Sequence, residues 1–281
     1  MDGIPVAVSC RVLKLVRAPY YRWLREPVGH AGRLRQQRVR ALRDAHHDDP
    51  EFGYRLLADE ARQAGFPMAD RTAWRLCRDA GIMSAIVKTR KRRGKKPGPP
   101  VCDDLVNRDF RATAGNELWL VDITEHRTRE GKLYLCAVKD VFSRRIVGYS
   151  ISDRMKARIA VDAVNNAAAR RGDVTGCIVH SDRGSQFRSR KFLHALTSHG
   201  LVGSMGRVGA AGDNAAMESF FAPVQKNVLD RQSWVTREQL RTAIAVWIEK
   251  KYHRKRRQAA LGRLTPIEFE TMMATPVNLA A

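Results

Sequence analysis

"ELWLVDITEHRTREGKLYLCAVKDVFSRRIVGYSIS", residues 117–152, is the stretch that decides the fold of this chain. It holds three runs rich in aliphatic, β-branched and aromatic residues, at 117–126, 132–140 and 143–152, separated only by short turn sequences. Runs of this length and composition predict β-strands, and connections this short predict an antiparallel meander. The centre of the fold is therefore expected to be a sheet.

Residues after the meander alternate between helical and extended patterns. The expected elements are, in order, a helix at 156–171, a strand at 176–182, a helix at 189–200, a strand at 201–205 and, after a glycine-rich stretch, a helix at 214–229. A last helix is expected to begin at Thr236, where "TREQ" has the spacing of a capping box, and to run toward Lys250. A meander followed by alternating helices and strands predicts an α/β domain with a mixed sheet.

The residues before 88 show helical patterns only. Two of these patterns, "YRLLADEARQAGF" at 54–66 and "DRTAWRLCRDAGI" at 70–82, are joined by a short turn. Glycines 65 and 81 are expected to end the two helices, and Asp70 is expected to cap the start of the second. This arrangement predicts a helix-turn-helix, a motif that binds DNA. A small helical bundle with a basic surface is the alternative interpretation.

The charge of the chain points to an anionic partner. It has 51 Lys and Arg against 29 Asp and Glu, a formal net charge of +22, and such an excess favours nucleic acid or an anionic membrane surface. The longest stretch without a charged residue, 192–206, is too short and too polar to span a bilayer. The N-terminus shows no signal-peptide pattern. Nucleic acid as partner and a cytoplasmic, nucleoid-associated location are therefore expected.

A basic stretch at 88–112 separates the helical region from the α/β region. It begins with seven Lys and Arg residues between Lys88 and Lys96, followed by prolines, a composition that disfavours a packed element. It is a linker or an arm that tracks DNA, and both interpretations stay open. We divide the chain into a helical DNA-binding region at 1–87, this linker at 88–112, an α/β core at 113–230 and a helical, basic tail at 231–281.

Three carboxylates stand out by their positions. Asp122 lies inside the first strand run, Asp182 ends the fourth, and Glu218 lies on the helix after the glycine-rich stretch. Carboxylates that converge from different elements form a hard, oxygen-rich site suited to Mg²⁺ or Mn²⁺. Two such ions can promote phosphodiester displacement without a histidine base. From position alone, turn residues and solvated side chains explain the same pattern.

The sequence around these carboxylates resembles a known family. The blocks "WLVDIT", "HSDRGSQF" and "GDNAAMESFF", with 35 residues between Asp182 and Glu218, are similar to the three signature blocks of DDE transposases with a retroviral-integrase-like core. The blocks "FGYRLLADEA" and "YHRKRRQAALGRLTPIEFE" narrow the resemblance to the second-reading-frame product of the insertion-sequence-three transposase family. It covers nearly the whole chain, and it implies an α/β ribonuclease-H-like core with a mixed sheet, preceded by an all-α helix-turn-helix region.

The resemblance implies DNA transposition by polynucleotidyl transfer. Asp122, Asp182 and Glu218 would bind two Mg²⁺ ions, with Mn²⁺ as a substitute, while water and then the freed 3′-hydroxyl attack phosphodiesters. A homo-oligomer would hold the terminal inverted repeats of the element and the target DNA, fused to or partnered with an upstream-frame product. The residues expected to contact DNA are Arg71, Arg75, Arg78, Lys91, Arg92, Arg93, Arg183, Gln186, Lys226, Arg254, Arg256 and Arg257.

The chain departs from the family pattern at four places. His253 and Gln258 stand in the tail where the family usually has Asn and His, and Gln225 stands where it often has a basic residue. Pro223 lies inside the helix of Glu218, and a proline there kinks or breaks a helix. Two alternatives stay open: a catalytically silent DNA-binding regulator or decayed copy, and a ribonuclease H or simple nuclease with the same core.

Overall fold

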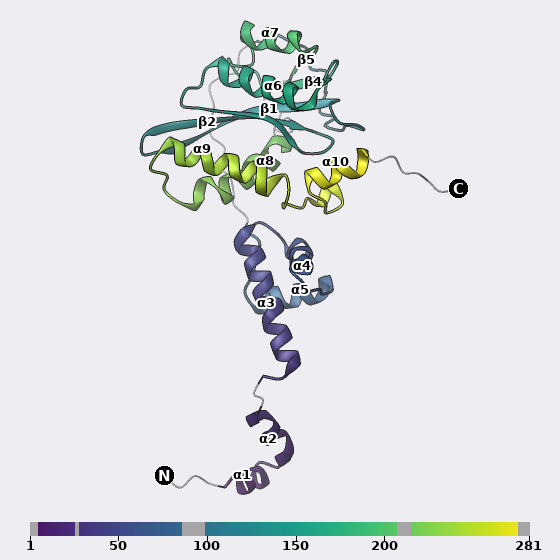
Figure 1. The fold of residues 1–281 in the computed structure, drawn as a ribbon, viewed down its shortest axis with the longest axis vertical. Coiled ribbons are helices and arrows are strands. Elements are labelled where there is room, and N and C mark those ends of the chain that lie inside the picture. Colours follow the sequence, from purple (N-terminus) through teal and green to yellow (C-terminus); the bar gives the residue numbers. More distant parts are fainter. Residues whose placement is uncertain (1–4, 26–27, 86–98, 207–214, 275–281) are drawn as a thin grey trace, which may run out of the picture. The chain divides into compact units, whose positions relative to one another are not determined.

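The computed structural model describes residues 5–25, 28–85, 99–206 and 215–274 (Figure 1). The chain divides into two compact units, Met1–Val87 and Lys88–Ala281. The first unit has one hydrophobic core, and the second has one on each face of a sheet. None of the helices described is long and apolar enough to cross a membrane.

The N-terminal unit is helical. Its helices are α1 (Val6–Val12), α2 (Arg17–Arg25), α3 (His30–Asp48), α4 (Tyr54–Gln63) and α5 (Asp70–Asp79). Helices α4 and α5 are the two that the sequence predicted before and after the short turn. Helix α3 packs against both of them through a core that includes Leu42, Phe52, Leu57 and Leu76.

Glycines end α4 and α5 as expected. Gly65 and Gly81 have φ values of +87° and +67°, in the left-handed region that other residues rarely adopt. After α4, Phe66 donates its backbone N–H to the carbonyl of Ala61 at 2.9 Å. This bond reaches back across the glycine and satisfies a carbonyl at the helix end. The turn between α4 and α5 is therefore fixed by backbone geometry.

Two features of this unit differ from the sequence expectation. Ala69, not Asp70, is the N-cap of α5, and Asp70 is the first helical residue, with no side-chain cap at this end of the helix. The carboxylate there still faces the positive end of the helix dipole, so an acid suits the position. Helix α3 lies in the region expected to be helical, but its bounds were not predicted, because its many arginines hide the narrow apolar stripe that is buried at Ala41 and Leu42.

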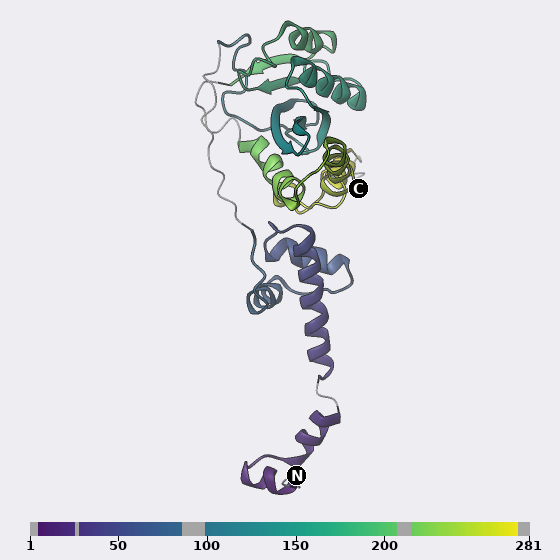
Figure 2. The ribbon, with the colours of Figure 1, turned by 90° about the vertical axis from the view of Figure 1, so that its left-hand side faces the viewer.

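The C-terminal unit is built on a five-stranded mixed sheet in the order β3-β2-β1-β4-β5. The strands are β1 (Leu118–Thr128), β2 (Gly131–Asp140), β3 (Ile146–Ser152), β4 (Ile178–Ser181) and β5 (Val202–Met205). The first three pair antiparallel, whereas β4 runs parallel to β1 and β5 runs parallel to β4. The expected meander and mixed sheet, seen from the side in Figure 2, are confirmed.

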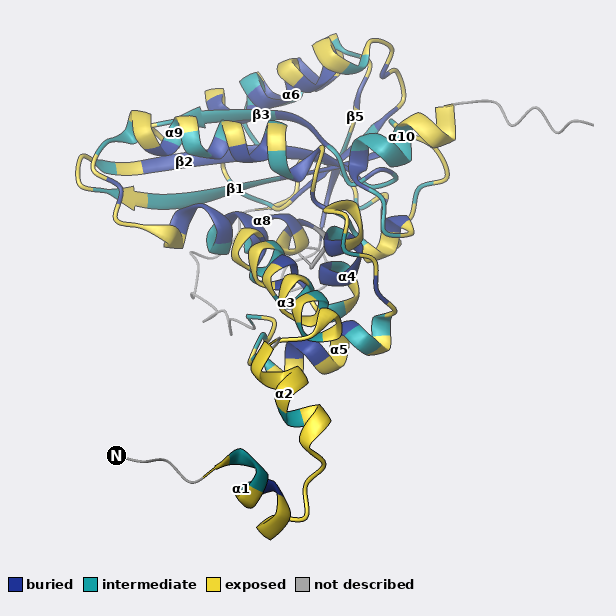
Figure 3. Ribbon diagram, turned by 60° about the horizontal axis from the view of Figure 1, so that its bottom comes forward, coloured by how far each residue is buried: buried dark blue, intermediate teal, exposed yellow. Residues whose placement is uncertain are grey.

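Helices cover both faces of this sheet (Figure 1). One face carries α6 (Ala157–Arg171) and α7 (Arg190–Ser198), and the other carries α8 (Ala215–Asn227) and α9 (Arg237–Val246). Successive residues of β2 alternate between the two cores: Leu133 and Leu135 pack on the α8 side, Tyr134 and Cys136 on the α6 side. Burial from both sides explains why β2 is an almost continuous apolar run and is coloured dark blue along most of its length in Figure 3.

Gly148 determines how closely α6 approaches β3. A Cβ at this position would overlap the backbone carbonyl of Ala163 and lie 2.6 Å from the Cβ of Ala167, both on α6. Any side chain would therefore force the helix away from the sheet. The small residues on both sides allow the α6 core to close.

The C-terminal residues pack on the α8 side of the sheet. Helix α9 begins at the expected capping box, in which the side chains of Thr236 and Gln239 each accept a backbone N–H from the other residue. It continues into a π-helical turn, Trp247–Tyr252, and α10 (Pro266–Ala274) follows. Both ends of this turn belong to the same hydrophobic cluster as Leu120 of β1. The division proposed between 230 and 231 therefore runs through a single core.

Candidate functional site

Asp122 lies in β1 and faces the α8 side of the sheet. It is two residues beyond Leu120, which packs in the α8-side core, so the two share one face of the strand. Its Oδ1 accepts the backbone N–H of Ile123 at 2.7 Å. Burial, and then the charges of Asp182 and Glu218, raise the pKa of Asp122 to about 7. The negative charges of Asp182 and Glu218 therefore act on Asp122.

Asp182 follows the last residue of β4, at the same level of the sheet as Asp122. Strand β4 runs parallel to β1 and pairs Ser181 with Val121, so the next residue of each strand lies at a common level. The Oδ1 of Asp182 accepts the backbone N–H of Gly184 at 2.8 Å. A Cβ on Gly184 would lie 2.9 Å from that same oxygen. The glycine therefore leaves the space that the carboxylate occupies.

Glu218 lies in the first turn of α8 and is exposed. An acid in the first turn is favoured by the helix dipole. Met217 and Phe220 on the same helix are buried in the α8-side core, and they fix α8 against the sheet. The helix continues past Pro223 to Asn227 as one element. The proline therefore does not break the helix that carries Glu218.

The three carboxylates have the chemistry of a divalent-cation site. Oxygen-only ligand sets suit Mg²⁺ and Mn²⁺. Burial is the main cause of the raised pKa of Asp122, and the charges of Asp182 and Glu218, which add to it, are negative charge that a cation would neutralise. Within the described ranges, however, no group of three or more His, Cys, Asp and Glu side chains is arranged to hold a metal ion. The residues fit such an ion by donor type and charge, and not by their present spacing.

A buried cation next to this site was missed by sequence reasoning. Lys139 lies on β2, two residues beyond Ala137 on the α8 side of the sheet, and is only 3% exposed. Its Nζ donates a hydrogen bond of 2.7 Å to the Oγ of Ser219, the residue that follows Glu218. The signal in the sequence is a lysine at a core-facing position of an otherwise apolar strand.

The residues expected to contact DNA near the carboxylates are placed as follows. Arg183 donates from Nε to the backbone carbonyl of Gly206 at 2.8 Å, and Gln186 donates from Nε2 to the carbonyl of Met155 at 3.5 Å. Lys226, near the end of α8, is half-buried. These bonds fix Arg183 and Gln186 in the loop after β4, and DNA contact by either of them stays a prediction.

Only Arg254 of the three tail arginines expected at the DNA is exposed. Arg256 is 9% exposed. Arg257 donates to the carbonyl of Arg263 at 2.7 Å and pairs with Glu268 at 3.6 Å. Arg256 and Arg257 are therefore turned largely into the folded tail, and contact of these three arginines with phosphates stays a prediction.

His253, one of the departures from the family pattern, is a buried structural residue. Its Nε2 accepts the backbone N–H of Ile146 at 3.2 Å, which assigns the ring proton to Nδ1. Nδ1 lies 3.3 Å from a carboxylate oxygen of Glu249. Burial lowers the pKa of His253, while the hydrogen bond from His253 lowers the pKa of Glu249 to about 2. The histidine thereby ties the tail to β3.

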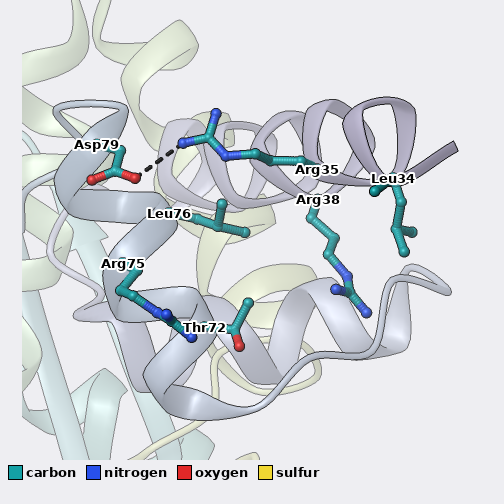
Figure 4. Close-up of a pocket in the computed structure, with 8 residues that line it drawn as sticks. Leu34, Arg35, Arg38, Thr72, Arg75, Leu76 and Asp79 are labelled. Carbon is teal, nitrogen blue, oxygen red and sulfur yellow. Dashed lines mark hydrogen bonds and ion pairs between the residues drawn. The ribbon is translucent and has the colours of Figure 1, made fainter. Parts of the chain in front are cut away.

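In the N-terminal unit, several arginines line a groove between α3 and α5 (Figure 4). It has a volume of about 340 Å³ and is lined by Ala31, Leu34, Arg35, Arg38, Thr72, Arg75, Leu76 and Asp79. An ion pair of 3.0 Å with Asp79 fixes Arg35, and Arg38 donates to the carbonyl of Pro67 at 2.7 Å. Arg75 lines the groove from α5. The groove thus combines three guanidinium groups with one carboxylate, a net positive lining.

The other residues expected to contact DNA in this part of the sequence differ in their surroundings. Arg71 is exposed on α5. The guanidinium of Arg78 lies 5.0 Å from the ring centre of Trp74 and donates to Asp79 at 3.0 Å. Lys91, Arg92 and Arg93 lie outside the described residues. The exposed face of α5 therefore presents a tryptophan beneath an arginine, a surface suited to an anionic, planar partner.

The sequence matches known protein families and individual transposases. Two integrase core domain families match residues 112–211 and 199–266. The transposase InsF for insertion sequence IS3A of Escherichia coli K12 is 35% identical over 269 residues, which covers 94% of this chain and 93% of that protein. The transposase for insertion sequence element IS904 of Lactococcus lactis is 39% identical over 167 residues, covering 59% of this chain and 66% of that protein.

Solved structures of similar fold are more distant in sequence. The HTLV-2 integrase catalytic core domain in complex with magnesium is 18% identical, with a TM-score of 0.45, and the match covers 57% of this chain and 99% of that chain. A chain of the simian T-cell lymphotropic virus intasome in complex with PP2A regulatory subunit B56 gamma is 16% identical, with a TM-score of 0.49, and the match covers 79% of this chain and 72% of that chain.

Proposed function

The chain belongs to the insertion-sequence IS3 family of transposases, and from that membership we propose that Asp122, Asp182 and Glu218 are the carboxylates with which it cuts and joins DNA. A member of this family is a polynucleotidyl transferase that acts in insertion-sequence transposition. The observation that supports the proposal is the parallel pairing of β1 with β4, which brings Asp122 and Asp182 to one level of the sheet. The charges of Asp182 and Glu218 add to burial in raising the pKa of Asp122.

The family depends on divalent metal ions, and we propose two Mg²⁺ ions, with Mn²⁺ as a substitute. When bound, such ions supply positive charge that stabilises the attacking and leaving oxygens of a phosphodiester displacement. The donor set supports this choice, because it consists of carboxylate oxygens alone. The pKa of Asp122 is about 7 without a cation, so its carboxyl group is partly protonated near neutral pH and must lose this proton to serve as a ligand.

Each of the three acids is positioned by a different element. Asp122 is held by a strand that is paired on both sides. Asp182 is oriented by the N–H of Gly184, and Glu218 is presented by α8. We propose that this arrangement orients a water molecule and, in the next step, the freed 3′-hydroxyl of the element for attack on a phosphodiester. In this mechanism the protein thus orients the attacking groups and supplies the charges around them.

We propose that the N-terminal unit holds DNA through its phosphates. The groove of Arg35, Arg38 and Arg75 supplies guanidinium groups, which recognise phosphate oxygens through paired hydrogen bonds. Arg71, exposed on α5 of the same unit, is a further proposed contact, and Arg254, exposed in the C-terminal unit, is another. The basic stretch at 88–112 and Lys226 are further proposed contacts. The DNA would be the terminal inverted repeats of the element and its target.

Assembly and location are proposed on the basis of the family. Transposases of this kind act on two element ends together, so we propose a homo-oligomer on DNA, at the nucleoid of a bacterial cell. We also propose an upstream-frame product as a partner or fusion. The net charge of +22 supports the DNA-bound state, because it favours association with a polyanion.

Strand transfer on a labelled duplex that carries the end of the element tests the catalytic assignment. The wild-type chain, alone and fused to the upstream-frame product, is compared with an Asp182→Asn variant in Mg²⁺ and in Mn²⁺. Loss of nicking and transfer in the variant, with DNA binding retained, is the expected result. Activity that survives Asp182→Asn contradicts the assignment.

The same experiment separates the alternative functions. DNA binding without any nicking by either wild-type form would favour the silent regulator or decayed copy. Cleavage of an RNA–DNA hybrid without strand transfer would favour a ribonuclease. The unbroken helix across Pro223 and the family membership both argue for the active transposase.

A further inference from the structure

Lys139 is a buried cation that the proposed chemistry does not use. It stands opposite Leu120 in the β1–β2 pair, one pleat away from the position of Asp122 and on the same face of the sheet. With 3% of its surface exposed, its amine has lost most of its hydration, which lowers its pKa to about 7. Burying such a group is unfavourable unless it makes hydrogen bonds. Its 2.7 Å bond to the Oγ of Ser219 is therefore a contact that the fold retains at an energetic cost.

Ser219 lies four residues before the proline of α8. In a regular helix its backbone carbonyl would accept the N–H of the residue four positions on. That residue is Pro223, which has no N–H to donate. The turn that carries Glu218 and Ser219 is therefore joined to the rest of the helix by one hydrogen bond fewer than usual. Helix α8 nevertheless runs without a break from Ala215 to Asn227.

The two observations meet at one residue. The side chain of Ser219 is bound from the sheet by Lys139, and Pro223, four residues on, has no N–H to donate to its carbonyl. The lysine belongs to the strand paired with the one that carries Asp122. Its bond thus connects α8, which carries Glu218, to the strand that pairs with β1, which carries Asp122.

We propose that Lys139 is a positioning residue: its hydrogen bond to Ser219 ties the proline-weakened turn of α8 to β2 and so sets where Glu218 lies relative to Asp122. This inference rests on the proposed roles of Glu218 and Asp122 as metal ligands. An apolar side chain would fill the same space at lower energetic cost, since replacing buried charges by apolar residues of similar volume is often neutral or stabilising. The polar contact is retained because it fixes a geometry.

The test is a Lys139→Met substitution in the full-length chain, with Lys132→Met as the matched control. Lys132 lies on the same strand but is exposed, and it pairs with Glu125 at 3.1 Å, away from α8. Three quantities are measured: the midpoint of thermal unfolding, Mn²⁺ binding by calorimetry, and strand transfer. For Lys139→Met we expect an unchanged or higher midpoint, with Mn²⁺ affinity and strand transfer lowered roughly 10- to 100-fold, the usual effect of losing a residue that orients a ligand.

Two further variants test the mechanism itself. Ser219→Ala removes the acceptor from the other side of the contact and should lower Mn²⁺ affinity and strand transfer in the same range. Adding Pro223→Ala to Lys139→Met restores an N–H to the carbonyl of Ser219, so both quantities should recover at least in part. Recovery is the result that a merely structural lysine would not give.

Unchanged Mn²⁺ affinity and strand transfer in Lys139→Met would overturn the inference. So would losses that simply follow a lower unfolding midpoint, or a double variant with Pro223→Ala that shows no recovery. An Asp182→Asn variant run beside these distinguishes a failure of the carboxylate assignment from a failure of the role proposed for Lys139. If it still transfers strands, the carboxylate assignment fails and this inference fails with it. If it is inactive while Lys139→Met behaves as wild type, only the role of Lys139 is overturned.

Discussion

Replacing Gly184 by alanine should damage the reaction while leaving the fold intact. A Cβ at this position would lie 2.9 Å from the Oδ1 of Asp182, whereas ordinary contacts begin near 3.4 Å. Gly184 does not have a positive φ, so alanine introduces no backbone strain. The clash is with the end of a flexible side chain, and the carboxylate can relieve it by moving about 0.5 Å. The cost therefore falls on the position of Asp182.

The size of the effect follows from that displacement. A misplacement of about 1 Å at a reacting centre costs about 100-fold in rate. Half of that displacement is expected to lower the rate roughly tenfold, which corresponds to about 1.4 kcal/mol of transition-state stabilisation. The free energy of unfolding should change by about 0.5 kcal/mol or less, since the substitution lies in a surface loop.

The assay is single-turnover strand transfer at saturating DNA, with thermal unfolding measured on the same preparations. Gly53→Ala is the control, because a Cβ there would meet no atom within 4 Å. A Gly184→Ala variant with the wild-type rate would refute the reasoning, since the carboxylate would then tolerate the displacement. A rate loss accompanied by an equal loss of stability would refute it as well.

Three other perturbations have defined outcomes. Arg75→Gln should weaken DNA binding to all sequences alike and reduce the slope of log affinity against log salt by about one, measured by fluorescence anisotropy; an unchanged slope would show that Arg75 contacts no phosphate. Gly148→Ala should destabilise the C-terminal unit by about 1–3 kcal/mol in denaturant unfolding, because its Cβ overlaps the carbonyl of Ala163. A variant as stable as the wild type would mean that α6 can move away from β3 without cost. Glu249→Gln should destabilise the chain at pH 7 but not near pH 2. The pKa of Glu249 is lowered to about 2, chiefly by the hydrogen bond from His253. The contribution of the Glu249 carboxylate to stability is therefore present above the ordinary carboxyl pKa and disappears as pH falls through 2. Unfolding at both pH values checks this, and an equal effect at both would contradict it.

Local features of the fold were accessible from the sequence because each depends on neighbouring residues alone. The strand β2, the glycines that end α4 and α5, and the capping box at Thr236 all have short-range causes, and all were confirmed. The bounds of α3 were not predicted, because its apolar stripe is narrow and interrupted by arginines. Asp70 was misplaced by one position, since caps and first-turn positions favour the same residue types.

Contacts between residues that are far apart in the sequence could not be predicted from local patterns. Arg254, Arg256 and Arg257 form one basic run in the sequence, yet the first is exposed and the other two are turned inward. Periodicity cannot distinguish them, because the chain turns within the run. Lys139 was overlooked for a similar reason: its partner Ser219 lies 80 residues away.

By itself, the sequence determined the order of the elements, the family, and the three acids proposed for catalysis, because these are encoded in local patterns and in spacing along the chain. Tertiary structure alone decided which charges face solvent, what holds Asp182 in place, and that a buried lysine meets the helix of Glu218 beside its proline. The physical reason is that burial and hydrogen bonding depend on which distant segments meet, and a pattern along one strand or helix carries no record of its partner.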